Sequence, residues 1–127
     1  MTTVTPHTHP KGVDRRRTRR VPVHGRAFAH VLEHSEDVVI HDVSLGGFLI
    51  ESRTLFRPNA LHQFRVAASD GQWKTMLTAM SLHHRTKVAE DGKTTHLVGL
   101  AFVEPIGEDA LKCLKTLVGH DTSVVSY

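Results

Sequence analysis

The sequence predicts a mainly β fold, an antiparallel barrel or sandwich of about six strands followed by one C-terminal α-helix. Short segments with alternating or β-branched apolar residues follow one another through most of the 127 residues. Turn signals separate them at short intervals, which is typical of antiparallel strands and not of βαβ units. Apolar residues at helical spacing occur near the end of the chain. Hydrophobic residues make up 39% of the chain, an ordinary fraction for a globular domain.

The first two strands form a predicted hairpin. Residues 21–32 alternate between two faces, which is the period of a strand. Residues 33–37 are polar and suit a turn. The short β-branched run 38–41 suits the returning strand.

Further strands continue the antiparallel pattern. Ser69-Asp70-Gly71 and Glu90-Asp91-Gly92 are predicted hairpin turns, because Asp and Gly tolerate the backbone angles that tight turns need. Residues 73–87 form either one long strand or two strands with a bend. The remaining strands are expected at residues 48–51, 61–67 and 94–102.

The C-terminal helix is predicted over residues 108–118. A proline and a glycine end the β region, and apolar residues then recur at helical spacing. Glu108 and Asp109 suit the positive end of the helix dipole, and Gly119 ends the helix.

By its length the chain is a single domain. We expect a disordered tail over residues 1–13, the folded domain over 14–119 and a short tail over 120–127. The N-terminus lacks the apolar stretch of a secretory signal, and no apolar run approaches the roughly 20 residues that span a membrane. A single cysteine, Cys113, excludes an internal disulfide and fits a reducing compartment. These features predict a cytoplasmic protein that does not enter a membrane.

Positive charge is concentrated in the N-terminal arm, residues 1–20. The formal net charge of the chain is +3. The arm holds 6 basic residues and 1 acidic residue (6 − 1 = +5), and the rest of the chain holds 10 basic and 12 acidic residues (10 − 12 = −2). An anion-binding tendency therefore belongs to the arm and to the surface against which it lies.

Five arginines stand among the six residues 15–20, directly before the first predicted strand. An arginine side chain is a permanently charged planar fork, which binds a phosphate or a guanine edge through two hydrogen bonds. Folding a domain rarely needs such a density of charge. A solvated basic tail with no defined partner is an equally good interpretation of the run taken alone.

The turn after the second strand contains Asp42, Ser44, Gly46 and Gly47. A structural interpretation is available, since Asp and Ser cap turns and Gly adopts positive φ. The functional interpretation is also chemically sound. A carboxylate accepts hydrogen bonds from guanine N1–H and N2–H, a hydroxyl bonds a base or a phosphate, and glycines let a flat ligand approach the backbone.

Catalysis finds little support in the sequence. There is no Gly-x-Ser-x-Gly elbow and no phosphate loop of the Gly-x-x-x-x-Gly-Lys type. None of the 11 histidines stands at a metal-ligand spacing with a carboxylate or a thiol. We therefore expect neither an enzyme nor a metal site.

Together the two stretches resemble the PilZ domain family of bacterial cyclic di-GMP receptors. The resemblance rests on Arg16-x-x-x-Arg20 running into a strand, on Asp42-x-Ser44-x-x-Gly47 one hairpin later, and on the strands with a closing helix. It covers roughly residues 14–118. It implies a six-stranded β-barrel that binds cyclic di-GMP at its outer surface. Residues 1–20 show no core-forming pattern, which predicts a flexible N-terminal arm.

The resemblance also implies the roles of individual residues. Arg16 and Arg20 would hold guanine and phosphate. Asp42, Ser44 and Gly47 would line the second half of the site, with Gly46 beside them.

The arginine run permits a second register, Arg15-x-x-x-Arg19. We prefer Arg16 and Arg20, because Arg20 directly precedes the strand.

Counting along a simple hairpin places Asp42 opposite about Ala27 or Phe28, away from Arg20. The arm must therefore fold back over the barrel if the two motifs are to meet.

These observations predict a stand-alone cyclic di-GMP receptor, whose arm becomes ordered on ligand binding and whose output is an unidentified partner protein. Because Arg15 adds a further fork, we expect two self-stacked ligand molecules per chain. No other cofactor is expected. The alternative is a small nucleic-acid-binding β-barrel with an arginine-rich arm, which the slightly acidic body and the few aromatic residues disfavour.

Overall fold

The computed structural model describes residues 19–119. The expected tails and residues 1–18 of the arm lie outside the described residues, and these include Arg15 and Arg16. Of the arginine run, the structure describes Arg19 and Arg20.

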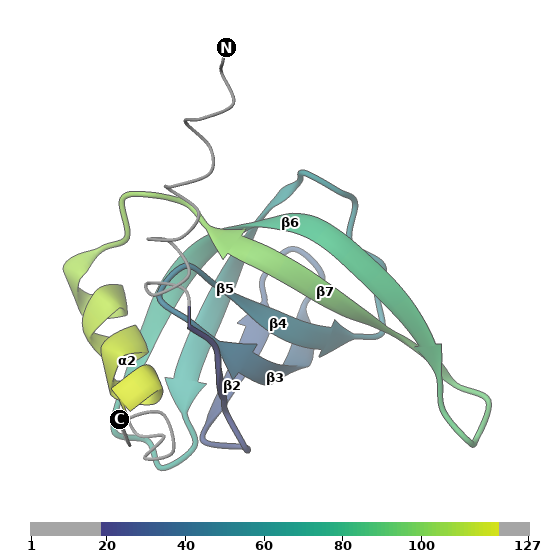
Figure 1. Cartoon of the computed structure of the whole chain (residues 1–127), viewed down its shortest axis with the longest axis horizontal. Helices are drawn as coiled ribbons and strands as arrows, with labels where there is room; N and C mark the ends of the chain where they lie inside the picture. Colours follow the sequence, from purple (N-terminus) through teal and green to yellow (C-terminus); the bar gives the residue numbers. More distant parts are fainter. Residues whose placement is uncertain (1–18, 120–127) are drawn as a thin grey trace.

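Antiparallel strands close into a six-stranded barrel that carries one helix, as the sequence and the family resemblance predict (Figure 1). The elements are β1 (Val21–Pro22), β2 (Ala27–Val31), β3 (Glu36–Val43), β4 (Gly47–Ser52), β5 (Leu61–Ala68), β6 (Lys74–Val88), β7 (Thr94–Phe102) and α2 (Glu108–Gly119). The ring follows the order β3-β2-β5-β6-β7-β4 and closes where β4 pairs with β3. The short strand β1 is additional and pairs with the end of β3.

The predicted bounds agree closely with the structure for three elements, β5, β7 and α2. The segment 73–87 is one long strand, β6, whose register against β7 shifts between Ser81 and His83. The expected single strand over 21–32 is wrong, because a turn divides it into β1 and β2.

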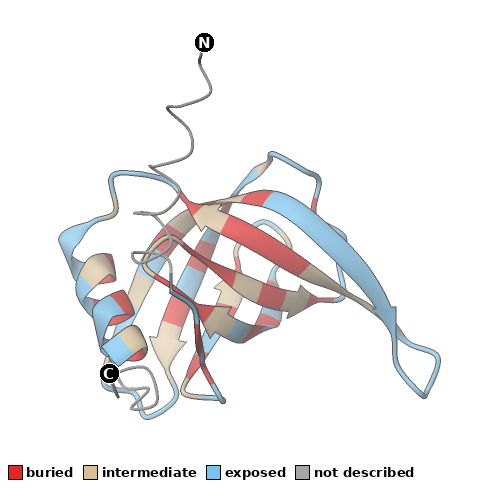
Figure 2. Cartoon of the chain, in the orientation of Figure 1, coloured by how far each residue is buried: buried red, intermediate tan, exposed pale blue. Residues whose placement is uncertain are grey.

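Large apolar side chains fill the barrel, among them three phenylalanines, Phe48, Phe56 and Phe64, each at most 2% exposed. The rings of Phe48 and Phe64 meet edge to face with centroids 5.1 Å apart, a favourable aromatic arrangement. Buried positions alternate with exposed ones along the strands, as the red and blue bands of Figure 2 show. The alternation in the sequence therefore reflects the one face of each strand that points into the barrel.

Helix α2 packs beside the barrel against β6 and β3 (Figure 1). It turns Ala110, Leu114 and Leu117 inward, so these residues extend the core. No helix in the part of the chain that the structure describes is long and apolar enough to cross a membrane.

Candidate functional site

The position of Asp42 depends on a bulge near the end of β3. Along this strand Glu36, Val38 and Ile40 point inward, and strict alternation would turn residue 42 inward as well. The register against β4 shifts between Ile40 and Asp42. Such a bulge re-aims the following side chains. His41 and Asp42 therefore both lie on the outside, and Val43 is buried.

The structure brings the two predicted motifs together. Strand β1 places Val21 opposite Val43 and Pro22 opposite Asp42. The preceding residue, Arg20, forms an ion pair with Asp42, with Nη1 2.8 Å from Oδ1. The Arg20 side chain is 51% exposed and the Asp42 side chain 25% exposed, so both charges are accessible from solvent.

The expectation that Asp42 lies opposite Ala27 or Phe28 is wrong, and the register of the β2–β3 hairpin and a local turn together explain the difference. In the β2–β3 pairing Ala29 lies opposite Val38, so an uninterrupted hairpin would put Gly25 opposite Asp42. The observed partner is Pro22, three residues earlier (25 − 22 = 3).

The extra residues form a tight turn over Val23–Arg26. The Arg26 N–H donates to the Val23 carbonyl at 3.0 Å. His24 and Gly25, the two central residues, have φ of 52° and 75°. Both angles are left-handed, which Gly adopts without strain. Because of this turn, Arg20 reaches Asp42 along the edge of the barrel without a longer fold-back of its own segment.

Ser44 is an internal part of its turn. Its Oγ accepts hydrogen bonds from the N–H groups of Gly46 at 3.1 Å and Gly47 at 3.2 Å, and its own N–H donates to the Gly47 carbonyl at 2.9 Å. The residue is 2% exposed. The hydroxyl therefore holds the turn in shape.

Gly47 is needed because β4 and β7 approach closely. A Cβ atom on Gly47 would lie 3.2 Å from Ala101 Cα and 3.1 Å from the Leu100 carbonyl carbon, and closer still to the Leu100 oxygen. The φ angle of Gly47 is not left-handed. The restriction at this position is steric, in contrast to the positive φ that the structural interpretation of the sequence invoked.

A network of polar side chains extends the site across the outside of the barrel. Glu51 accepts a hydrogen bond from the Thr95 hydroxyl at 2.6 Å, and its other oxygen lies 2.7 Å from His41 Nε2 and 3.5 Å from Lys87 Nζ. The hydrogen bond from Thr95 lowers the pKa of Glu51; partial burial opposes the shift, while His41 and Lys87 reinforce it. Sequence reasoning missed this network, because it joins four strands.

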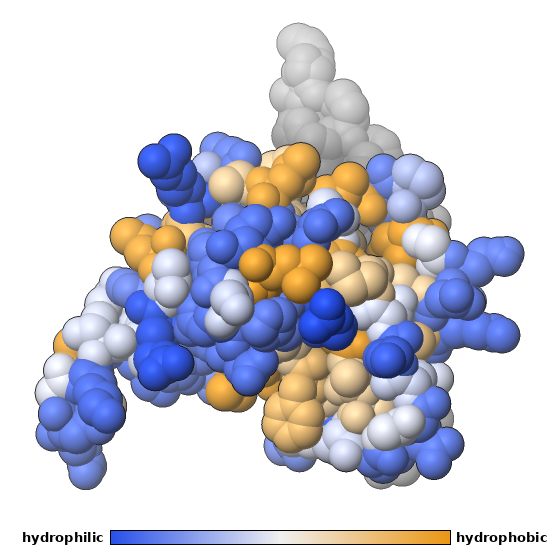
Figure 3. All heavy atoms as spheres, turned by 180° about the vertical axis from the view of Figure 1, so that it is seen from behind, coloured by the Kyte–Doolittle hydropathy of each residue, from blue (hydrophilic) through white to orange (hydrophobic). Residues whose placement is uncertain are grey.

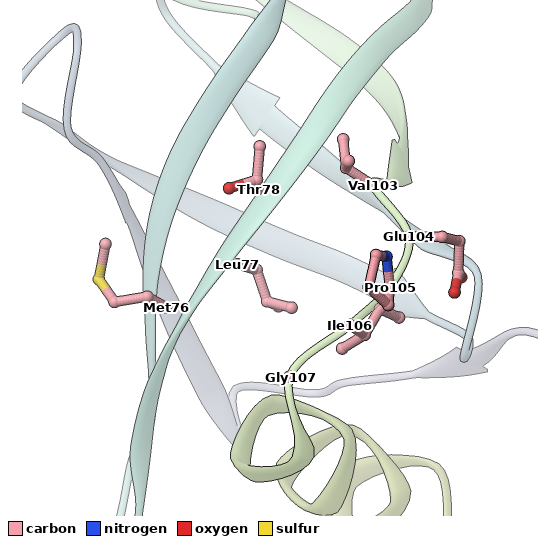
Figure 4. Close-up of a pocket in the computed structure, with 8 residues that line it drawn as sticks. All are labelled: Met76, Leu77, Thr78, Val103, Glu104, Pro105, Ile106 and Gly107. Atoms are coloured by element: carbon pink, nitrogen blue, oxygen red, sulfur yellow. The ribbon is translucent and has the colours of Figure 1, made fainter.

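The described residues also line hollows that lie away from both motifs. One of about 300 Å³ lies between β6 and the segment before α2 (Figure 4), and is lined by Met76–Thr78 and Val103–Gly107. The face shown in Figure 3 carries apolar side chains interspersed with hydrophilic ones. Of the motif residues, Arg20 and Asp42 form an open surface site, since both side chains are accessible from solvent.

The comparisons with known proteins agree with this fold. The PilZ domain family matches residues 14–120. Among solved structures, the c-di-GMP-bound PilZ domain of YcgR from Escherichia coli has a TM-score of 0.58 and 18% identity, over 87% of this chain and 94% of that one. The uncharacterized Legionella protein Lpg0364 has a TM-score of 0.54 and 16% identity, over 85% of this chain and 98% of that one.

The K. pneumonia MrkH–c-di-GMP complex has a TM-score of 0.62 and 15% identity, over 87% of this chain and 54% of that one, so the chain spans about half of MrkH. At these identities the likeness shows a shared fold. No curated protein gave a match. The family match includes both motifs, the whole described barrel and α2, and the chain therefore belongs to the PilZ domain family.

Proposed function

We propose that this chain is a receptor for cyclic di-GMP and binds it on the outside of the barrel, where β1 meets the end of β3. The ion pair between Arg20 and Asp42 carries the proposal, because it joins residues of both motifs that are 22 positions apart. The c-di-GMP complexes of the YcgR PilZ domain and of MrkH, which share the fold, support this choice of ligand.

The chemistry of the pair suits a guanine nucleotide. The Asp42 carboxylate accepts from guanine N1–H and N2–H, and the Arg20 fork donates to guanine O6 and N7 or to a phosphate. Without ligand the two side chains satisfy each other. An exposed pair of this kind contributes at most about 1 kcal/mol. The ligand can therefore replace it at a small cost.

The turn supports the site in this proposal. Ser44 acts indirectly, since its hydroxyl is occupied inside the turn. Gly46 leaves room beside Asp42 for a flat base to approach the backbone, whereas Gly47 is buried and acts indirectly, by letting β4 and β7 approach closely.

The proposal includes the arginines outside the described residues. Because Arg20 is the residue at Asp42, we favour the register Arg16-x-x-x-Arg20 over Arg15-x-x-x-Arg19. Arg16 would grip the second guanine or a phosphate. Arg15 would serve a second, stacked ligand molecule, and the ordered arm would then present a new surface to a partner protein.

Titration calorimetry with cyclic di-GMP tests the proposal. Arg16→Ala, Arg20→Ala and Asp42→Ala should each weaken binding by about 2 kcal/mol, because each removes a charge-assisted hydrogen bond. Arg65→Ala, which removes an exposed arginine of β5 away from the motifs, is the matched control. Far-UV circular dichroism should be unchanged throughout.

Each outcome has a distinct meaning. Wild-type protein that fails to bind cyclic di-GMP would refute the function, whereas normal binding by the Arg20 and Asp42 variants would refute the site. A nucleic-acid-binding barrel would lose affinity steeply with salt and show no preference between cyclic di-GMP and cyclic di-AMP.

A further inference from the structure

We infer that Arg26 is the positioning residue of this site, which holds β1 where Arg20 meets Asp42 and ties that strand to the end of α2. The inference rests on the proposed function but goes beyond the two motifs. Arg26 belongs to neither of them and lies in the turn between β1 and β2.

The guanidinium of Arg26 donates to three backbone carbonyls from two distant parts of the chain. Nε donates to the Val23 carbonyl at 3.0 Å, and Nη2 donates to the Pro22 carbonyl at 2.9 Å. Nη1 donates to the Leu117 carbonyl at 3.1 Å, across 91 positions of sequence. Hydrogen bonds from a charged donor are stronger than neutral ones. A single side chain therefore connects β1, its turn and α2.

Strand β1 needs such support because it makes few hydrogen bonds of its own. It has two residues, and Pro22 lacks an N–H to donate. The next ladder bond is that from the Val23 N–H to the His41 carbonyl at 3.1 Å. Burial of Val21 and Val23, both 0% exposed, determines which face of the segment points inward. Arg26 adds a hydrogen bond to the carbonyl of Pro22, the residue that lies opposite Asp42.

Helix α2 gains from the same contact. The last four carbonyls of a helix have no partner within the helix, and a cation near them is favourable. The last turn of α2 contains no basic residue. Arg26 supplies the missing cation from another element and satisfies the carbonyl of Leu117. The position of β1 is thereby fixed relative to the helix.

Weakening the contacts of Arg26 should lower the affinity for cyclic di-GMP, because Arg20 is then held less firmly. Arg26→Lys keeps the charge but cannot reach three carbonyls at once, so β1 loosens while Arg20 and Asp42 are intact. We expect cyclic di-GMP binding to weaken about tenfold, which corresponds to about 1.4 kcal/mol. Arg26→Met, which keeps the apolar stem and loses every donor, should weaken it further.

A double-mutant cycle separates positioning from general damage. Cyclic di-GMP affinity is measured by NMR titration for wild type, Arg26→Lys, Arg20→Ala and the double variant, with Arg65→Lys as control. If Arg26 acts by positioning Arg20, Arg26→Lys should have little effect once Arg20 is alanine. An equal loss in both backgrounds, or no loss in either, would overturn the inference.

Amide hydrogen exchange measured without ligand tests the positioning role of Arg26 independently of the proposed function. Arg26→Lys and Arg26→Met should speed amide exchange at Val23, whose N–H bonds β3, and leave β5 and β7 unchanged. Unchanged exchange at Val23 in folded variants would refute positioning even if cyclic di-GMP is not the ligand. If wild type fails to bind and exchange still rises, the proposed function fails and the role of Arg26 in holding β1 stands.

Discussion

Gly47→Ala should severely destabilise the barrel. The motif offers two explanations for this glycine, contact with a ligand or a backbone requirement, and the structure supports the second. A Cβ atom would meet the backbone of β7 at Leu100 and Ala101, within 3.1–3.2 Å of two carbon atoms and closer to an oxygen. Because the obstacle is backbone, no change of side-chain rotamer can relieve it.

The size of the effect follows from the pairing. Strands β4 and β7 pair continuously from Gly47 opposite Ala101 to Ser52 opposite His96. Moving one end of this ladder also disturbs the two backbone groups of Gly47 that bond Ser44. Overpacking costs about 1–3 kcal/mol where side chains can adjust, so we expect about 3 kcal/mol or more here. For a domain of this size that lowers Tm by about 12 °C or more.

Urea unfolding followed by far-UV circular dichroism measures the change in the free energy of unfolding. The matched control is Gly107→Ala, since a Cβ atom there has no neighbour within 4 Å and φ is not left-handed. If Gly47→Ala unfolds within about 1 kcal/mol of wild type, the steric argument fails. In that case a loss of cyclic di-GMP binding by this folded variant would assign Gly47 to the ligand.

Two further predictions concern stoichiometry and acid stability. Arg15→Ala should move the calorimetric endpoint from two ligands per chain towards one, and a wild-type endpoint of one would contradict the stacked pair. Burial raises the pKa of Glu36, but hydrogen bonds from the Arg53 backbone N–H and from two hydroxyl groups outweigh it, so the pKa is lower than that of an ordinary glutamate. Its stabilising contribution should therefore be present above the pKa of an ordinary glutamate and lost as pH falls through the lowered pKa. Glu36→Gln should flatten that part of the stability curve, and an unchanged acid slope would refute the assignment.

The barrel was predictable because its strands bury one face. The period of two in the sequence follows directly from that burial, as β3 and β5 illustrate. The failure at residues 21–32 has a local cause. Gly25 falls on the same face of the alternation as Val21 and Val23, yet it lies in a turn and has a positive φ. A glycine inside a strand pattern is a known signal of such a break.

The geometry of the site was less predictable than its residues. Asp42 falls on the inward parity of Glu36, Val38 and Ile40, and its carboxylate alone does not reveal the bulge, because the Glu36 carboxylate on the same parity stays buried. No sequence signal exists either for the contact between Arg26 and the end of α2. It depends on how distant segments pack, which no local pattern encodes.

The last prediction concerns the signalling mechanism. Cyclic di-GMP should order the arginine-rich arm while the barrel stays nearly rigid. In the proposed function the ligand would bring two negative charges to the place where β1 meets Asp42, and the neighbouring arginines would repel one another without it. Fixing a residue costs about 1–2 kcal/mol of backbone entropy, so ordering should be confined to a few residues around 15–20. Amide hydrogen exchange should show new protection over residues 15–23 and 42–47. In α2, any response should be confined to the last turn, where Arg26 bonds Leu117. Protection of residues 15–20 before ligand is added, or a response centred on the first turns of α2, would be incompatible with this mechanism.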